Sequence, residues 1–238
     1  MASEFDQYVE SYREIINRGA ALTGETFEYF IGLRLNLLRA ELGSLGEPSP
    51  RRILDFGSGI GATLAQIREQ FPRASLDGID SSLRSVEVAE KLRLPDTRFH
   101  HSDASELPFA AGTFDLVYSN GTFHHINPEQ REAIFAELAR VLLPGGHAFI
   151  FENNPLNPVM VREMRRNPFD ADARMLFPWH LRNHLRLAGL RARSPRYYVF
   201  LPRHLKRIWW TERYLRRVPL GAQYYVWATK TASASSSA

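Results

Sequence analysis

The stretch Ile53–Gly61 reads ILDFGSGIG, and this stretch decides the fold. A short apolar strand runs into a glycine-rich turn, and a helix is predicted directly after it, over residues 62–71. Glycines suit such a turn because the backbone must bend tightly and approach a ligand closely, which a Cβ atom would prevent. The N-terminus of the following helix offers free N–H groups and a positive dipole to an anionic group. The stretch therefore predicts a strand–turn–helix unit that binds a ligand.

Strand and helix patterns alternate on both sides of this turn. Such alternation of short apolar strands with helices predicts a mostly parallel sheet with helices on both faces. Two helices are predicted within residues 3–42, separated near Gly19 and Gly24. The predicted strands are 52–56, 74–79, 98–101, 114–119, 147–151, 190–201 and 223–228, and the later helices are 62–71, 82–92, 128–142, 179–189 and an amphipathic one at 203–217. Pro144–Gly146 is interpreted as a sharp turn into the fifth strand.

The length of 238 residues predicts one sizeable core. Composition divides the chain into an N-terminal helical cap, a ligand-binding core, a proline-broken segment, the C-terminal half of the sheet and a disordered tail. The proline-broken segment is expected to form a lid or binding wall. The boundaries follow the connectors and composition shifts and are 1–46, 47–152, 153–177, 178–230 and 231–238.

Composition excludes several classes of protein. Cysteine is absent, which excludes disulfides, thiolate metal ligands and cysteine nucleophiles. No apolar run approaches the roughly 20 residues that span a bilayer, and the N-terminus lacks the pattern of a secretory signal. The net charge is +4, but the basic residues are spread along the chain and no recognition motif accompanies them, so nucleic-acid binding is not expected. These features are typical of a cytoplasmic enzyme.

Two acidic residues accompany the glycine turn. Asp55 lies within the strand, two residues before the first glycine, and Asp80 closes the next strand. A carboxylate in the second position can accept both hydroxyls of a ribose. Asp80 could instead cap the next helix, a role that Ser81 or Ser82 could also fill.

Five motifs in order resemble those of the class I S-adenosylmethionine-dependent methyltransferases. After ILDFGSGIG come DGID, HSDASELPF, FDLVYSN and LARVLLPGG, at 77–80, 101–109, 114–120 and 138–146. The resemblance is strong over roughly residues 50–152 and loose elsewhere. It implies a doubly wound, Rossmann-like α/β fold of seven mostly parallel strands with the last one antiparallel, an N-terminal helical lid, and S-adenosylmethionine as the cofactor.

The resemblance also implies roles for individual residues. The turn glycines would border the methionine part of the cofactor, Asp80 would hold the ribose hydroxyls, and Asn120 would lie beside the methionine part. Asp103, with the Ala104 backbone, would contact the adenine edge. Asp55 would organise the loop or approach the amino group. The full expected set is Asp55, Gly57, Gly59, Gly61, Asp80, Ser81, Asp103, Ala104 and Asn120.

Candidate catalytic residues follow the fourth and fifth strands, because ligands of open α/β sheets bind beyond the carboxyl ends of the strands. His124 and His125 are candidates for the base that removes a proton from the acceptor. Neighbouring residues point in different directions, so at most one should face the acceptor; a histidine here could also cap the loop or pack as a neutral ring. Glu152 could orient an amine or phenol, or satisfy backbone N–H groups of the next loop.

The flanking segments supply the expected acceptor contacts. Tyr8 and Tyr12 would stack on an aromatic acceptor, and Asn154 follows the fifth strand. Arg34 could meet the cofactor carboxylate, although a solvated helix face is the simpler interpretation. The helix at 203–217 could lie on an anionic membrane, but packing against the sheet with solvated arginines is favoured. No metal site is predicted, because no ligand spacing stands on a helix face and neighbouring histidines chelate poorly.

The sequence thus predicts an enzyme that transfers a methyl group to an O, N or activated C atom of a small organic molecule, from a secondary-metabolite, carbohydrate or lipid pathway. An alternative is a non-catalytic S-adenosylmethionine-binding scaffold or sensor. A nicotinamide-dependent oxidoreductase is disfavoured by the Gly-x-Gly-x-Gly spacing. The acceptor and the oligomeric state stay open.

Overall fold

The structure is a computed structural model that describes residues 25–46, 49–102, 106–170 and 172–231. Several predictions lie outside these residues: those for Tyr8, Tyr12, Asp103 and Ala104, the first helix, and the disordered tail.

One mixed sheet forms the centre of the molecule, in the order β3-β2-β1-β4-β5-β8-β6, with β7 also paired to β8. The first five strands are parallel, and β8 runs antiparallel to its neighbours. The predicted Rossmann-like sheet is therefore confirmed. The strands are β1 (Arg52–Phe56), β2 (Ser75–Asp80), β3 (Thr97–His101), β4 (Phe114–Asn120), β5 (Leu142–Asn153), β6 (Leu190–Ala192), β7 (Arg196–Tyr198) and β8 (Gln223–Lys230).

The edge beyond β8 differs from the prediction of one strand over residues 190–201. Here β6 pairs with the last residues of β8 and β7 with its first residues, while β5 occupies the other side of β8 along most of its length. The two segments thus share one edge position, so the sheet has seven positions filled by eight segments. Val199, just after β7, has a φ of +60°, a strained value for a β-branched residue.

The fifth strand is longer than predicted. Pro144–Gly146 does not end it but lies within β5, where the register with β4 shifts: Phe114 pairs with Leu142, and Leu116 with His147. The extra residues form a bulge, which a φ of +82° at Gly145 accommodates. The expected sharp turn is therefore a bulge in a continuous strand.

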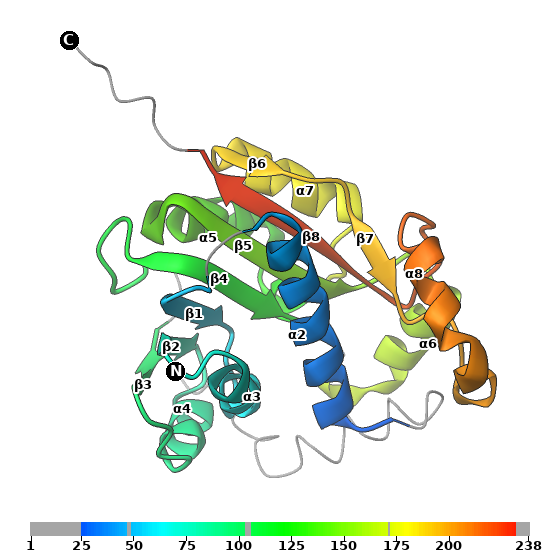
Figure 1. Ribbon diagram of the computed structural model, residues 1–238, viewed down its shortest axis with the longest axis horizontal. Helices are drawn as coiled ribbons and strands as arrows, with labels where there is room; N and C mark the ends of the chain where they lie inside the picture. Colours follow the sequence, from blue (N-terminus) through cyan, green and yellow to red (C-terminus); the bar gives the residue numbers. More distant parts are fainter. Residues whose placement is uncertain (1–24, 47–48, 103–105, 171, 232–238) are drawn as a thin grey trace.

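Helices cover both faces of the sheet (Figure 1). In the view of Figure 1, α2 (Phe27–Ser44) crosses in front of the strands, and α5 (Pro128–Val141) and α7 (Pro178–Leu187) lie behind them. Adjacent residues of a buried strand face opposite layers, so Ile53 packs in the core on the side of α2 and Leu54 in the core on the side of α5. The remaining helices of the first half are α3 (Ala62–Gln70) and α4 (Leu83–Glu90).

The second predicted N-terminal helix, α2, belongs to the core. Ile31 and Leu35 on α2 are fully buried and pack in one cluster with strand residues such as Tyr118 and Phe149. The helix is held to the sheet by this apolar face, so in its described part the predicted helical lid is a fixed layer. Thr26 caps its N-terminus by accepting a hydrogen bond from the Tyr29 amide.

Two later segments have secondary structure that the sequence did not predict. The segment 153–177 contains α6 (Pro158–Arg166) and the 3-10 helix η4 (Pro168–Asp170), each of which begins at a proline. Residues 203–217 form the 3-10 helix η5 (Arg203–Thr211) and the short α8 (Glu212–Leu215) instead of one amphipathic α-helix. Leu205 and Ile208, expected to pack on the sheet, are exposed.

Among the described helices, none has both the length and the apolar character needed to cross a membrane.

Candidate functional site

The glycine turn links β1 to α3 at the carboxyl edge of the sheet. Gly57, Gly59 and Gly61 all have a positive φ, between +51° and +78°, which favours glycine. A Cβ added to Gly57 would lie 2.1 Å from Oγ1 of Thr122, and one at Gly61 would lie 2.9 Å from the Phe99 ring. At Gly59 an added Cβ would meet no described atom within 4 Å. The outer two glycines therefore let the turn pack closely, and Gly59 faces open space.

Asp80 closes β2 and holds this turn. Its Oδ2 accepts a hydrogen bond from the Gly59 amide at 2.8 Å, and its Oδ1 accepts one from the Ser82 amide at 2.9 Å. Burial raises the pKa of Asp80, and these backbone bonds oppose the shift. The alternative capping role belongs to Ser82, whose hydroxyl accepts from the Ser85 amide at the start of α4. Asp80 is therefore a loop anchor whose oxygens keep further lone pairs.

Asp55 lies beneath the same turn and is 2% exposed. Burial and the nearby charge of Asp80 raise its pKa to about 8, although Arg34 opposes the shift. Within the described part of the chain, its Oδ2 has no hydrogen-bond partner. The same holds for the hydroxyls of Ser58, in the turn, and Ser119, near the end of β4. Buried polar atoms without partners are uncommon and point to a bound group that supplies them.

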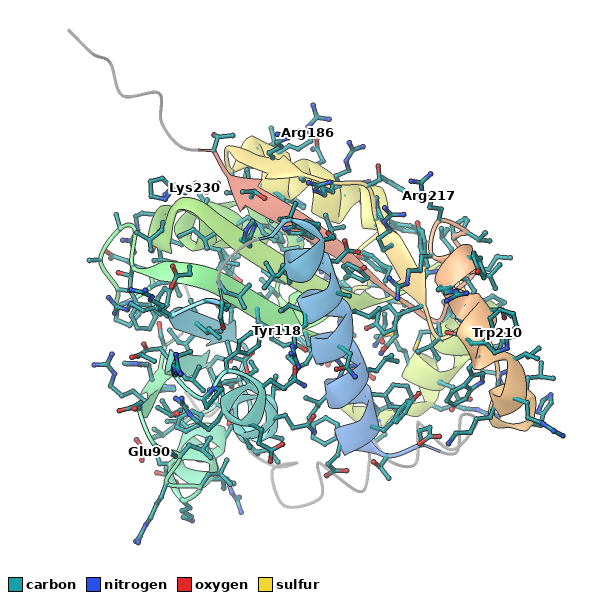
Figure 2. All side chains as sticks on the ribbon, viewed as in Figure 1. Glu90, Tyr118, Arg186, Trp210, Arg217 and Lys230 are labelled. Atoms are coloured by element: carbon teal, nitrogen blue, oxygen red, sulfur yellow. The ribbon has the colours of Figure 1, made fainter. Side chains whose placement is uncertain are left out.

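Arg34 lies in this region too, instead of on a solvated helix face. It is 3% exposed, and Nη1 donates to Oε1 of Gln223 on β8 at 3.4 Å. Its guanidinium interacts with the side chains of Tyr118 and Tyr198, and Tyr118, on β4 and labelled beside α2 in Figure 2, packs in one buried cluster with residues of α2. The guanidinium is carried into the interior because it lies on the apolar face of α2, next to Leu35. A buried cation thus stands near the buried carboxyl group of Asp55.

These groups fit an amino acid in its zwitterionic form. Asp55 can accept from an ammonium, Arg34 can donate to a carboxylate, and the open space at Gly59 leaves room for the chain between them. The methionine part of S-adenosylmethionine has both charged groups. Two other expected cofactor residues have positions compatible with the site: Asn120 ends β4, and Ser81 follows β2 with its side chain exposed.

The two adjacent histidines lie in the 3-10 helix η3 (Phe123–His125), directly after β4. His124 Nδ1 lies 2.6 Å from Oε2 of Glu152, whose Oε1 accepts from the Phe123 amide at 2.8 Å. His124 Nε2 and His125 Nε2 each lie 3.4 Å from Oδ1 of Asp170. Both rings therefore turn toward one carboxylate, so the expectation that neighbouring histidines point apart is wrong.

Charge in this cluster divides the roles of the two histidines. Burial opposes protonation of His124, but Glu152 and Asp170 raise its pKa to about 10. Burial and the charge of His124 lower the pKa of His125 to about 3. His124 is 4% exposed and has a carboxylate near each ring nitrogen, whereas the His125 side chain is 14% exposed. An acceptor can reach His125 more easily than His124.

Asp170 was not identified from the sequence. It belongs to η4, far along the chain from the histidines, and no residue spacing links the two. The one available signal was that a carboxylate occurs in the segment expected to cover the site.

The predicted substrate residue Asn154 does not face a ligand. It is fully buried, its Nδ2 donates to the carbonyls of Pro219 and Gly221, and its Oδ1 accepts from the Leu156 amide. Its amide is used to hold the backbone.

A cavity of about 250 Å³ opens beside α2. Its wall includes Tyr198, whose ring also belongs to the buried cluster around Tyr118. Residues of η5 and α8 also line it, and the ring centroids of two lining residues, Tyr29 and Trp209, lie 6.0 Å apart. The lining is aromatic and aliphatic with three charged residues: Tyr29, Phe30, Leu33, Leu37, Tyr198, Val199, Leu201, Trp209, Trp210, Glu212, Arg213 and Arg216.

Comparison with known proteins agrees with this architecture. Residues 53–146 match a family model described as a methyltransferase domain. The trans-aconitate 2-methyltransferase of Deinococcus radiodurans is 37% identical over 95 residues, which cover 40% of this chain and 35% of that protein. The demethylmenaquinone methyltransferase of Chlorobaculum parvum is 32% identical over 164 residues, which cover 68% of this chain and 61% of that protein. The chain thus spans less than two thirds of each relative.

Among solved structures, a methyltransferase chain from a complex with the Trm112 activator of Haloferax volcanii has the same fold. The TM-score is 0.67 at 18% identity, over 98% of this chain and all of that chain. The match at 53–146 contains the glycine turn, Asp80 and the His124–His125 pair. The ordered motifs, the sheet topology and these matches make the chain similar to the class I S-adenosylmethionine-dependent methyltransferases.

Proposed function

We propose that this protein transfers a methyl group from S-adenosylmethionine to an O, N or activated C atom of a small organic molecule. The observation that carries the proposal is the set of buried polar groups around the glycine turn. Asp55 and Arg34 are nearly fully buried, one a carboxyl group and the other a cation, and Asp55 keeps an oxygen without a partner among the described residues. The open face of Gly59 belongs to the same turn region. A zwitterionic amino-acid group satisfies both side chains at once.

The cofactor, when bound, supplies a methyl group on a sulfonium, which is already a good leaving group. The protein therefore has to position the acceptor and exclude water. Asp80 accepts the ribose hydroxyls through its remaining lone pairs while it holds the turn. Asp55 and Arg34 would hold the two charged ends of the methionine part.

The acceptor proton passes to His125 in this proposal. His125 follows β4 at the carboxyl edge, its pKa is low enough that it is neutral near pH 7, and its side chain is partly accessible. A neutral imidazole carries the lone pair that a base requires. Its lowered pKa makes it a weak base, which suits an acceptor that is already acidic, such as a phenol or an enol. His124 and Glu152 act as positioning residues through their 2.6 Å hydrogen bond.

The aromatic cavity beside α2 is proposed to take an apolar part of the acceptor. Its wall includes Tyr198, which also borders Arg34, so the cavity adjoins the proposed methionine position. Arg213 and Arg216 on the far wall would favour an acceptor with an anionic group. The segment 153–177 covers the histidine side of the site through η4, which is consistent with the lid expected there.

Two measurements test the function. Calorimetry with S-adenosylhomocysteine and with NAD, under the same conditions, should give saturable binding of the first only; binding of NAD alone would overturn the proposal. Incubation with methyl-labelled S-adenosylmethionine and fractionated metabolite pools should then give a labelled product. Cofactor binding without any labelled product would favour the alternative of a non-catalytic scaffold or sensor.

A further inference from the structure

Three potential metal-binding atoms meet between η3 and η4. They are Nε2 of His124, Nε2 of His125 and Oδ1 of Asp170, which all lie within 4.8 Å of one another. Two imidazoles and one carboxylate form a donor set that binds divalent transition metals, Zn²⁺ among them. The residues come from two distant parts of the chain, so the fold and not local sequence creates this arrangement.

The distances suit a metal ion better than a direct ion pair. Both histidine nitrogens lie 3.4 Å from Asp170 Oδ1, whereas a charge-assisted hydrogen bond is about 2.7–2.9 Å long. Ligand atoms of a tetrahedral ion with bonds of about 2.0–2.1 Å are separated by about 3.4 Å. Two of the three separations therefore already have this length, and the third, between the two histidine nitrogens, is at most 4.8 Å.

Outer hydrogen bonds orient two of the three ligands. His124 Nδ1 lies 2.6 Å from Glu152, so Nδ1–H can donate to the carboxylate. An ion at Nε2, which lies 3.4 Å from Asp170, would displace the proton that the two carboxylates favour there. Asn167 Nδ2 donates to Oδ2 of Asp170 at 2.7 Å, which turns Oδ1 toward the histidines. A histidine that ligates a metal commonly donates its other ring N–H to a carboxylate, and this partner fixes the ring.

The local backbone explains how adjacent histidines can share a ligand position. In η3, the His125 amide donates to the Thr122 carbonyl, and the two rings lie 4.1 Å apart, between centroids. The His124 carbonyl accepts from the Arg174 amide at 2.7 Å, which holds the segment after η4 against η3. The side chains of the three ligands are between 4% and 14% exposed, and Nε2 of His125 is itself buried, so the cluster is shielded from solvent.

We propose that His124, His125 and Asp170 bind one divalent transition-metal ion, with Zn²⁺ as the reference ion and a fourth position open to water or a ligand. The ion would join η4 to η3. This binding does not depend on methyl transfer. Where the proposed function also holds, an ion bound to His125 would compete with proton removal by the same ring, so Zn²⁺ should inhibit transfer.

Metal titration of the full chain tests the proposal. Protein freed of metal with a chelator and then dialysed should bind one Zn²⁺ per chain in calorimetry, and Co²⁺ should give the intense visible bands of a four-coordinate site. His125→Gln and Asp170→Asn should each weaken binding by more than about tenfold, and Glu152→Gln by about 10- to 100-fold. His180→Gln, at an exposed histidine of α7, is the matched control and should change the affinity less than twofold.

Two results would overturn the proposal. One is the absence of saturable Zn²⁺ binding and of Co²⁺ bands in protein whose circular dichroism shows that it is folded. The other is unchanged binding in the His125→Gln/Asp170→Asn double variant, which would place the ion at exposed histidines. Binding of S-adenosylhomocysteine is measured in the same samples, so a failure of the cofactor proposal is recorded separately from a failure of the metal proposal.

Discussion

The carboxylate of Asp80 joins the end of β2 to the glycine turn, because its Oδ2 accepts a hydrogen bond from the amide of Gly59 at 2.8 Å. The Asp80 side chain thus positions the turn, whose middle glycine faces open space. The same carboxylate can still accept hydrogen bonds from a ligand. The shape of the turn and the proposed recognition of ribose depend on the same carboxylate. This coupling makes Asp80 the most informative residue of the proposed cofactor site.

Asp80→Ala should weaken the binding of S-adenosylhomocysteine by about 30- to 150-fold, because the loss of charged hydrogen bonds to two hydroxyls costs roughly 2–3 kcal/mol. Calorimetry measures this affinity. Ser82→Ala is the matched control: it removes the cap of α4, so the free energy of unfolding should fall by about 1 kcal/mol, while the affinity stays within twofold. An unchanged dissociation constant in folded Asp80→Ala would contradict the ribose assignment.

The outer and middle glycines of the turn should respond differently to substitution. Gly57→Ala places a Cβ 2.1 Å from Oγ1 of Thr122, so the free energy of unfolding should fall. In Gly59→Val the added Cβ has no described atom within 4 Å, although the φ of +51° adds backbone strain of roughly 1–2 kcal/mol. The Gly59→Val protein should therefore fold but gain no thermal stability from S-adenosylhomocysteine. A normal ligand-induced rise in its melting temperature would show that the cofactor does not pass Gly59.

Asp55 should make the stability of the cofactor-free protein depend on pH. Its pKa is about 8 in the folded state and close to 3.8 when the chain is unfolded. A raised carboxyl pKa favours the folded state at low pH, so this contribution to the free energy of unfolding is complete below about pH 4. It is lost as the pH rises from about 4 through about 8, at up to roughly 1.4 kcal/mol per pH unit. Urea unfolding at several pH values should show this decline, and Asp55→Asn should remove it. An equal slope in the variant would assign the pH dependence to other groups.

The same carboxyl group should couple cofactor binding to proton release. An ammonium beside Asp55 favours its ionised form, so binding of S-adenosylhomocysteine below about pH 8 should release a proton, and the affinity should increase toward that pH. Calorimetry in buffers of different ionisation enthalpy measures the released proton. Asp55→Asn should abolish the release. Proton release that persists in the variant would place the ammonium elsewhere.

Glu152 should be important for stability irrespective of catalysis. Glu152→Ala removes a buried partner from both the His124 ring and the Phe123 amide, so the free energy of unfolding should fall by about 3–5 kcal/mol. Denaturant unfolding in the presence of a chelator measures the loss. Glu163→Ala, which removes a surface i,i+3 pair with Arg166, should cost less than about 1 kcal/mol. Similar losses in the two variants would mean that the buried contacts of Glu152 add little.

His125→Gln should lower the rate of methyl transfer by roughly 10²–10⁴, the usual contribution of a positioned base, and should leave the affinity for S-adenosylhomocysteine within about twofold. Single-turnover transfer from labelled cofactor to an acceptor found in the screen measures the rate. His124→Gln should lower it through the position of His125 instead of through the cofactor. If both variants keep more than about a tenth of the rate, positioning alone carries the reaction.

The sequence alone determined the order of the core elements, because the signals involved are local. Short apolar strands separated by helical patterns specify a parallel sheet that is covered on both faces, and a turn with three positive φ angles requires glycine whatever surrounds it. The motif spacing then indicated the resemblance to the methyltransferases, and residues 53–146 match a methyltransferase domain model. Local signals were weaker at residues 190–201 and 203–217, where the structure has a divided edge strand and a 3-10 helix.

Only the tertiary structure decided which distant side chains meet. Asp170 reaches His124 and His125 because η4 folds back over η3, and Arg34 is buried because the apolar face of α2 lies against the sheet. Asn154 binds backbone carbonyls of a loop more than sixty residues later in the chain. No spacing along the chain encodes these contacts, since they follow from the packing of whole elements, whose apolar area outweighs the preference of any single polar group for water.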